Sequence, residues 1–222
     1  MNRFGSIARE AAGGALVLVY EVGAHHAVTT PGFEKLGLAL VLAPVAILAL
    51  GLAARSPRRA LLAPPIAAAC AMLWVSRAAL VRHYAWGLFF EHVVFNGALG
   101  YLFGRTLASG REPLCSQFAA MVRGRPFAPA IAAYTRRITM TWTLFFAGVV
   151  AISAVLFATA SLSVWSTFAN YLTLPLAALL FVGEHACRRF ALPGIESSGM
   201  LASIRAYRRS GESDRFSFDN FR

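Results

Sequence analysis

The stretch "ITMTWTLFFAGVVAISAVLFATA", residues 138–160, contains no charged side chain, and neither does "LGLALVLAPVAILALGLAA", residues 36–54. An α-helix needs about 20 consecutive apolar residues to cross the hydrocarbon core of a bilayer. In lipid, a helix satisfies all of its backbone hydrogen bonds internally, whereas a single strand of this length would not. Both stretches therefore predict membrane-spanning helices.

The composition of the whole chain agrees with this prediction. Of the 222 residues, 58% are apolar and 14% are charged, whereas soluble domains carry about a quarter charged residues. The predicted spans are residues 11–29, 36–54, 60–80, 84–103, 138–160 and 164–186. We therefore expect an all-α fold, an integral membrane helical bundle of about six transmembrane helices forming one domain over residues 1–190. Residues 191–222 are polar and predict a cytoplasmic tail that is partly disordered.

The distribution of basic residues predicts the orientation of this bundle. An even number of spans places both termini on one side of the membrane. With both termini in the cytoplasm, 18 of the 21 basic residues lie on the inner side, and the outer loops keep only Lys35, Arg77 and Arg82. This bias follows the positive-inside rule, so we predict N-in, C-in topology. Twenty Arg against one Lys indicate a GC-rich bacterial genome, and hence a multi-pass protein of the bacterial cytoplasmic (inner) membrane.

One long inner loop, residues 104–137, which we call the basic loop, carries much of this charge. Its apolar residues Leu114, Phe118, Met121 and Val122 follow helical spacing and predict a short amphipathic helix at the membrane interface. Its candidate docking residues are Arg105, Arg111, Arg123, Arg125, Arg136 and Arg137.

The net charge of +11 has two explanations. Basic side chains near the inner surface are attracted to anionic lipids. They also suit the docking of an acidic soluble partner, because complementary charge raises encounter rates. No nucleic-acid-binding motif accompanies the charge, so we predict no nucleic-acid partner.

Polar side chains interrupt three of the predicted spans. This intramembrane polar cluster comprises Glu21, His25, His26, Glu91, His92, Asn96 and Asn170. Glu21 with His25, and His92 with Asn96, are spaced i, i+4, so each pair shares one helix face. Ionisable residues within spans are rare and usually face a bundle interior or a wet cavity.

Three interpretations of the cluster compete. A metal site would use the imidazoles and carboxylates, but five His residues are too few for the histidine boxes of membrane desaturases. A proton relay or polar substrate cavity is the second interpretation. In the third, which we favour, the groups hydrogen-bond one another and fix helix packing.

The sequence contains no motif of a known catalytic or cofactor site. A nucleophile elbow, a phosphate loop, HExxH and a dinucleotide fingerprint are all absent. We therefore assign no catalytic residue, metal or cofactor, and we do not expect an enzyme.

Three further stretches carry a family resemblance: "YLFGRTLASGREPLCSQFAAMVRG" (101–124), "YTRRITMTWTLFF" (134–146) and "WSTFANYLTLPL" (165–176). Over roughly residues 85–190, the chain resembles a family of small bacterial integral membrane proteins of unassigned activity, encoded with aryl-polyene or xanthomonadin pigment biosynthesis enzymes. The recognisable points are the turn Gly104, Arg105, Thr106 and Leu107, then Pro113, Leu114, Tyr134, Thr135, Arg136, Trp142 and Asn170.

This resemblance implies a context for the chain. The neighbouring enzymes of the family build a polyene on an acyl carrier protein, and the product ends in the outer membrane. The implied function is a non-catalytic inner-membrane accessory protein for aryl-polyene-type lipid or pigment biosynthesis. Its expected partners are membrane lipid and an acyl carrier protein or ketosynthase docked at the basic loop. The alternative is a small transporter or membrane enzyme that uses Glu21, His25, Glu91 and His92.

Overall fold

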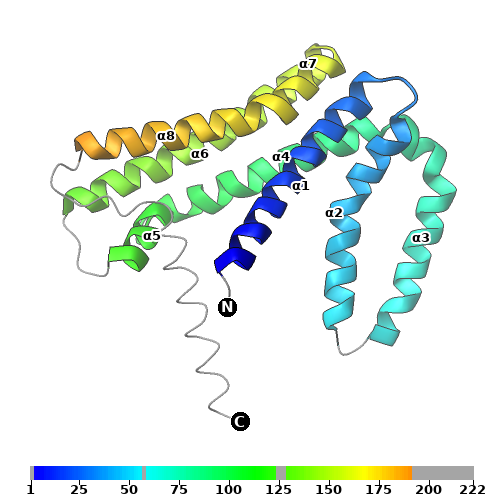
Figure 1. Ribbon diagram of the computed structural model, residues 1–222, viewed down its shortest axis with the longest axis horizontal. Coiled ribbons are helices and arrows are strands. Elements are labelled where there is room, and N and C mark those ends of the chain that lie inside the picture. The colour runs from blue at the N-terminus through cyan, green and yellow to red at the C-terminus, as the bar shows by residue number, and fades with distance from the viewer. Residues whose placement is uncertain (1–2, 57–58, 124–128, 192–222) are drawn as a thin grey trace, which may run out of the picture. The chain divides into compact units, whose positions relative to one another are not determined.

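The computed structural model describes residues 3–56, 59–123 and 129–191, and these residues are helical with no strand among them (Figure 1). The predicted all-α class is therefore confirmed. Arg125 and residues 192–222 of the predicted tail lie outside the described residues. The elements are α1 (Arg3–Thr29), α2 (Glu34–Arg55), α3 (Arg59–Arg82), α4 (Tyr84–Gly104), the 3-10 turn η1 (Arg105–Leu107), α5 (Leu114–Arg123), α6 (Pro129–Thr159), α7 (Leu162–Ser166), the π-helix η2 (Thr167–Leu172) and α8 (Thr173–Ala191).

Four helical segments are long and apolar enough to cross a membrane. They are α2, residues Pro64–Arg82 of α3, α6, and the continuous segment Leu162–Arg188 that runs through α7, η2 and α8. These segments indicate a membrane protein. Helices α1 and α4, which coincide with two further predicted spans, are not among them, and both carry residues of the intramembrane polar cluster. Six spans with N-in, C-in topology therefore remain a prediction.

The chain divides into two compact units. The first unit comprises Met1–Phe95 and Val150–Pro175, and the second comprises Asn96–Val149 and Leu176–Arg222. Helices α4 and α6 are each divided between the two units.

Small and aromatic residues form the core of the first unit. Ala24 of α1, Leu88 of α4, Trp165 of α7 and Ala169 of η2 are buried against one another. Small residues at such contacts let helix backbones approach closely. The Trp165 indole Nε1 donates a hydrogen bond of 3.0 Å to the buried Ser153 Oγ, so the polar edge of this large ring is also satisfied.

Tyr84, at the start of α4, joins three helices of the first unit. Its hydroxyl donates to the carbonyl of Ala27 on α1 at 2.7 Å. Its ring lies against Gly37 of α2, where an added Cβ would collide with the ring. Gly37 is therefore required by the close approach of the ring, and not by an unusual backbone angle.

Helices α2 and α3 form an antiparallel hairpin whose sides are largely uncovered by the described protein (Figure 1). Val45, Leu48 and Val75 are 62%, 64% and 81% exposed. In a membrane protein, such apolar side chains face lipid, because lipid tails solvate them as well as a protein core would.

In the second unit, α4, α5, α6 and α8 are held by ring contacts and hydrogen bonds. Phe103 of α4 packs on Trp142 and Phe146 of α6, with ring centroids 6.1 and 5.8 Å away. The Tyr134 hydroxyl of α6 donates to the carbonyl of Glu184 on α8 at 3.1 Å. Each helix of this unit is thus tied to α6.

Candidate functional site

The first half of the basic loop is anchored by Thr106. Its hydroxyl donates to the carbonyl of Phe103 at 2.7 Å and accepts from the backbone N–H of Leu114 at 2.9 Å. One buried side chain therefore joins the end of α4 to the start of α5. Between them, Gly110 takes a φ of 76°, which glycine adopts without steric cost.

Buried hydroxyls then fix α5 against α6. Ser116 Oγ and Thr135 Oγ1 are 2.6 Å apart, and Ser116 is the donor because Thr135 Oγ1 donates to the carbonyl of Ile131. The backbone N–H of Cys115 donates to Thr139 Oγ1 at 3.2 Å. The side chains of Ser116, Thr135 and Thr139 are all buried. Helix α5 is therefore held through its polar face.

The opposite face of α5 is apolar and uncovered among the described residues. Phe118 and Met121 are 39% and 46% exposed. The helix lies where the apolar spacing of Leu114, Phe118 and Met121 predicts one. Its position at a membrane interface remains a prediction. The contact of α5 with α6 also buries the Cys115 thiol. Burial raises the pKa of this thiol and makes it a poor nucleophile.

Four exposed arginines, which we call the arginine surface, lie on this framework. Arg105 is in η1, Arg111 follows it, and Arg136 and Arg137 lie in the first turns of α6. Arg136 Nη2 donates to the carbonyl of Leu107 at 3.0 Å, and Arg111 Nη1 to the carbonyl of Arg105 at 3.5 Å. The first of these bonds brings the start and the end of the basic loop together. Of the two other predicted docking residues, Arg123 ends α5 and Arg125 lies outside the described residues.

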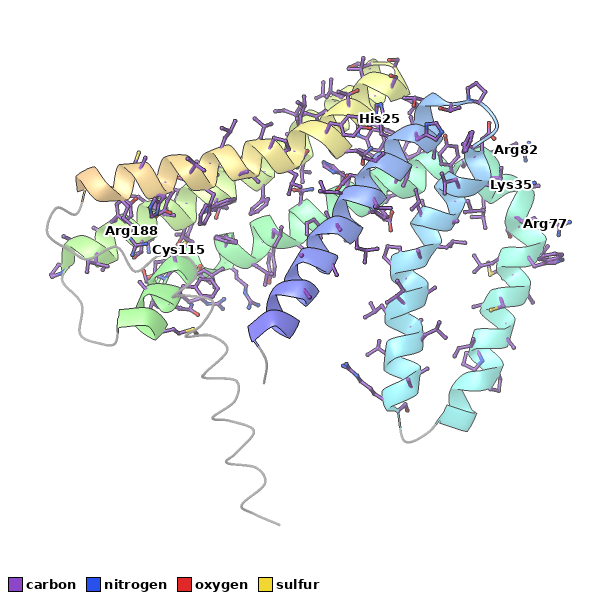
Figure 2. The ribbon with its side chains drawn as sticks, in the orientation of Figure 1. His25, Lys35, Arg77, Arg82, Cys115 and Arg188 are labelled. Carbon is purple, nitrogen blue, oxygen red and sulfur yellow. The ribbon has the colours of Figure 1, made fainter. Side chains whose placement is uncertain are left out.

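In the first unit, His25 of α1 points toward the segment that contains Ser166 and Asn170 (Figure 2). His25 Nδ1 lies 3.1 Å from Ser166 Oγ, and Asn170 Nδ2 donates to the same oxygen at 2.8 Å. The Ser166 hydroxyl accepts from Asn170, so its own proton is available to His25 Nδ1. The Tyr171 ring packs on the imidazole, with centroids 4.4 Å apart.

The other members of the cluster make separate contacts. The Tyr20 hydroxyl of α1 donates to Glu91 Oε2 of α4 at 2.6 Å. The His92 ring approaches Phe168 edge-on, with centroids 6.4 Å apart. Glu21 is half-buried. In the first unit, His25 and Asn170 therefore share Ser166, and Glu91 is bonded to Tyr20.

Two further predicted members are His26 and Asn96. His26 is exposed, and its Nδ1 lies 3.1 Å from Thr30 Oγ1 in the next turn of the same chain segment. Asn96 is buried, with 4% of its surface exposed, and belongs to the second unit.

Sequence reasoning missed Tyr20, Ser166 and Tyr171. Ser166 precedes Asn170 by one helical turn, and this spacing is the signal that would have found it. Tyr20 and Tyr171 adjoin predicted members, but a tyrosine beside an apolar run is usually interpreted as an interface anchor.

Asn170 and Tyr171 lie within the π-helix η2. Short π-helical segments inside α-helices are rare and frequently occur at functional sites. Pro175 lies one turn beyond Tyr171 and has no N–H to donate backward, so a regular helical ladder could not continue through it. Thr173 Oγ1 donates to the carbonyl of Phe168 at 3.0 Å, which satisfies one backbone group of the altered register.

Within residues 3–56, 59–123 and 129–191, no group of three or more His, Cys, Asp or Glu side chains is arranged to hold a metal ion. In comparisons with known proteins, no protein-family model, curated protein or solved structure matches the chain.

Proposed function

We propose that this chain is a non-catalytic accessory protein of the bacterial cytoplasmic membrane. In this proposal it serves aryl-polyene-type lipid or pigment biosynthesis, and an acyl carrier protein or synthesis enzyme docks at its basic loop. It has six spans with N-in, C-in topology, so that the basic loop faces the cytoplasm. The observation that carries the proposal is the Arg136 to Leu107 hydrogen bond, which joins both ends of the loop into one arginine surface.

The charge of the second unit supports an acidic partner. Its described residues contain two carboxylates, Glu112 and Glu184, against the four exposed arginines. The Tyr134 hydroxyl donates to the carbonyl of Glu184 and lies 3.4 Å from its Oε1. This excess of positive charge steers an acidic protein toward the membrane and raises its association rate, most strongly at low salt.

The residue type supports a phosphate-bearing partner. A guanidinium offers a planar pair of N–H groups that binds a phosphate through two parallel hydrogen bonds, which a lysine ammonium does not. The phosphopantetheine arm of an acyl carrier protein presents such a phosphate. Phe118 and Met121 add exposed apolar surface to the same loop.

Charge reversal tests this proposal in a pigment-producing strain. Arg105→Glu, Arg111→Glu and Arg137→Glu together leave the Arg136 to Leu107 bond in place. We expect pigment output to fall about tenfold, the scale of lost electrostatic steering. Lysine at the same three positions retains the charge but lacks the bidentate guanidinium, so its output should lie between that of the wild type and that of the triple Glu variant.

A single charge reversal outside the basic loop tests whether the fall in pigment output comes from a change in membrane orientation. Arg55→Glu changes an exposed arginine at the end of α2, outside the basic loop, and should leave output unchanged. Normal output from the triple Glu variant, with normal membrane insertion, would contradict the proposal.

A second candidate function is a small transporter or membrane enzyme. It is favoured by one observation, the His25, Ser166 and Asn170 hydrogen bonds beside the π-helix. An imidazole held in this way by a hydroxyl and an amide suits proton exchange within a membrane.

Conservative substitutions decide between the two candidates. Glu91→Gln keeps an oxygen for the Tyr20 hydroxyl but cannot exchange a proton, and His25→Gln likewise removes the imidazole. His26→Gln, at an exposed neighbour, is the control. Retained pigment output in all three supports the accessory function. Loss of pigment output in Glu91→Gln and His25→Gln but not in His26→Gln, with normal protein levels, would instead support a transporter or membrane enzyme.

A further inference from the structure

The arginine surface contains two adjacent arginines, Arg136 and Arg137, whose contacts differ. Both lie in α6 and both are exposed. Arg136 Nη2 donates to the carbonyl of Leu107 at 3.0 Å, across 29 positions of the chain. Among the described residues, the Arg137 guanidinium makes no hydrogen bond, ion pair or ring contact, and only its backbone carbonyl is used, by Thr141 Oγ1 at 3.0 Å. Consecutive helix positions point about 100° apart, so the two side chains leave α6 in different directions.

The hydrogen bond of Arg136 falls on the end of a helix. Helix α4 continues directly into η1, and the helix ends at Ala108, where ψ is 152°. The last carbonyls of a helix lack partners within it and carry the negative end of its dipole, which favours a cationic donor. Two of these carbonyls accept from arginines: that of Leu107 from Arg136, and that of Arg105 from Arg111 Nη1 at 3.5 Å. Arg136 therefore caps this helix, and the helix end offsets part of its charge.

Arg137 keeps its charge and its donors for a group from outside the described protein. A guanidinium has five N–H donors in one plane, and two of them can bind one carboxylate or phosphate through parallel hydrogen bonds. In Arg136, by contrast, one donor is bonded to Leu107 and fixes the position of the side chain. The same residue type thus occurs at successive positions in two different states.

We propose that these neighbours have different roles. Arg137 binds an anionic group of the docked partner through two parallel hydrogen bonds, and Arg136 is a positioning residue that holds the basic loop by capping the helix of α4 and η1. The role of Arg137 rests on the proposed function, whereas the role of Arg136 does not. The two roles differ in the chemistry that they need. A single carbonyl needs one donor, which a lysine ammonium also supplies, but a bidentate contact needs the planar guanidinium.

Backbone hydrogen exchange of the purified full-length protein in detergent tests the role of Arg136. In Arg136→Ala, the exchange rate of residues 104–114 should rise about fivefold, because the helix end loses a hydrogen bond from a charged donor. Arg136→Lys should restore most of the protection, and it also covers a failure of Arg136→Ala to fold. Arg137→Ala is the matched control, since it removes the same charge at the next position, and it should leave exchange in this segment unchanged.

Pigment output in the producing strain tests the role of Arg137. We expect output to fall about two- to threefold in Arg136→Ala and in Arg137→Ala, as a part of the fall expected of the triple Glu variant. Lysine should separate the two positions. Arg136→Lys should restore output, whereas Arg137→Lys should stay clearly below the wild type at equal protein levels in the membrane.

Three results would each overturn the inference. They are equal exchange in Arg136→Ala and Arg137→Ala, normal output in Arg137→Ala, and full rescue by Arg137→Lys, which would assign Arg137 to anionic lipid. The triple Glu variant distinguishes this failure from a failure of the proposed function. Normal output in Arg137→Ala together with low output in the triple Glu variant overturns the inference alone, whereas normal output in both variants overturns the proposed function as well.

Discussion

The basic loop, in the second unit, and those members of the intramembrane polar cluster that lie in the first unit use polar residues in opposite ways. In the loop, short hydroxyl side chains such as Ser116 and Thr135 are buried, and the charged side chains of the arginine surface remain exposed. In the cluster, titratable side chains such as Glu91 and His25 are themselves bonded to partners from other helices.

This difference indicates where each region can act. Exposed arginines on a hydroxyl-bonded framework are available to a partner from outside. Side chains such as His25, with Ser166 fully buried beside it, have already used hydrogen-bonding capacity within the protein. We therefore propose that the basic loop serves recognition and that the cluster serves helix packing. Four predictions test this division of roles, from the largest expected effect to the smallest.

Removing the central aromatic ring of the first unit should have the largest effect. Trp165→Ala deletes a side chain with 1% of its surface exposed and leaves a cavity beside Ala24 and Leu88. We expect the free energy of unfolding to fall by about 3–5 kcal/mol. Unfolding by sodium dodecyl sulfate in mixed micelles measures this. Trp86→Ala, at a ring that is 51% exposed, is the control and should cost clearly less.

Two glycines on one helix should respond in opposite directions. Gly37→Ala places a methyl group against the Tyr84 ring and should destabilise the first unit by about 1–3 kcal/mol. Gly51→Ala meets no atom within 4 Å, and it should be neutral or stabilising because alanine favours helix more than glycine does. The same unfolding titration compares them. Equal effects would contradict the packing of Tyr84 between α1, α2 and α4.

Two serine substitutions compare the regions directly. Ser166→Ala removes the shared partner of His25 and Asn170 and should cost about 1–3 kcal/mol. Ser116→Ala removes the bond between α5 and α6 and should cost about 1 kcal/mol. In Ser116→Ala, the rate of backbone hydrogen exchange should increase in α5 alone. Ser163→Ala, at an exposed residue, is the control. Faster exchange throughout both units in Ser116→Ala would show that the loop is part of the common core.

The difference in thiol labelling between Cys115 and Cys187 is the smallest expected effect, and the same experiment tests the predicted topology. Cys187 is exposed near the end of α8, whereas burial raises the pKa of the Cys115 thiol. The thiolate is the reactive form, so Cys115 should react more slowly near neutral pH, and the difference should narrow as the pH rises. A maleimide that does not cross membranes should label Cys187 only from the cytoplasmic side. Labelling of Cys187 from the outer side of intact cells would contradict N-in, C-in topology.

Apolar run length was sufficient to locate the helices but not all of their ends. The predicted spans 36–54 and 60–80 fall within α2 and α3, whose limits coincide with charged or turn residues. The predicted span 138–160 begins nine residues later than α6, because the charge-free run begins only after Arg136 and Arg137. A helix can carry exposed arginines in its first turns at a membrane surface, where they reach the interface.

The candidate sites were less accessible to sequence reasoning. Helical spacing predicts a helix within the basic loop because that pattern is local, and α5 spans Leu114–Arg123. The contacts of Ser166 with His25 and of Tyr20 with Glu91 join residues 141 and 71 positions apart, and no local pattern carries that information. The π-helix η2 had only Pro175 as a signal, and a proline in a span equally predicts a simple kink.

Site-specific photo-crosslinking in the producing strain tests the central claim most directly. Benzoylphenylalanine replaces Ser109, an exposed residue between Arg105 and Arg111, and in a control strain it replaces Leu179, an exposed residue of α8. We predict an adduct with an acyl carrier protein or ketosynthase at Ser109 but not at Leu179, and its loss in the triple Glu variant. No protein adduct at Ser109 during active pigment synthesis, or an adduct that persists in the triple Glu variant, would contradict the assignment of the basic loop as a docking surface.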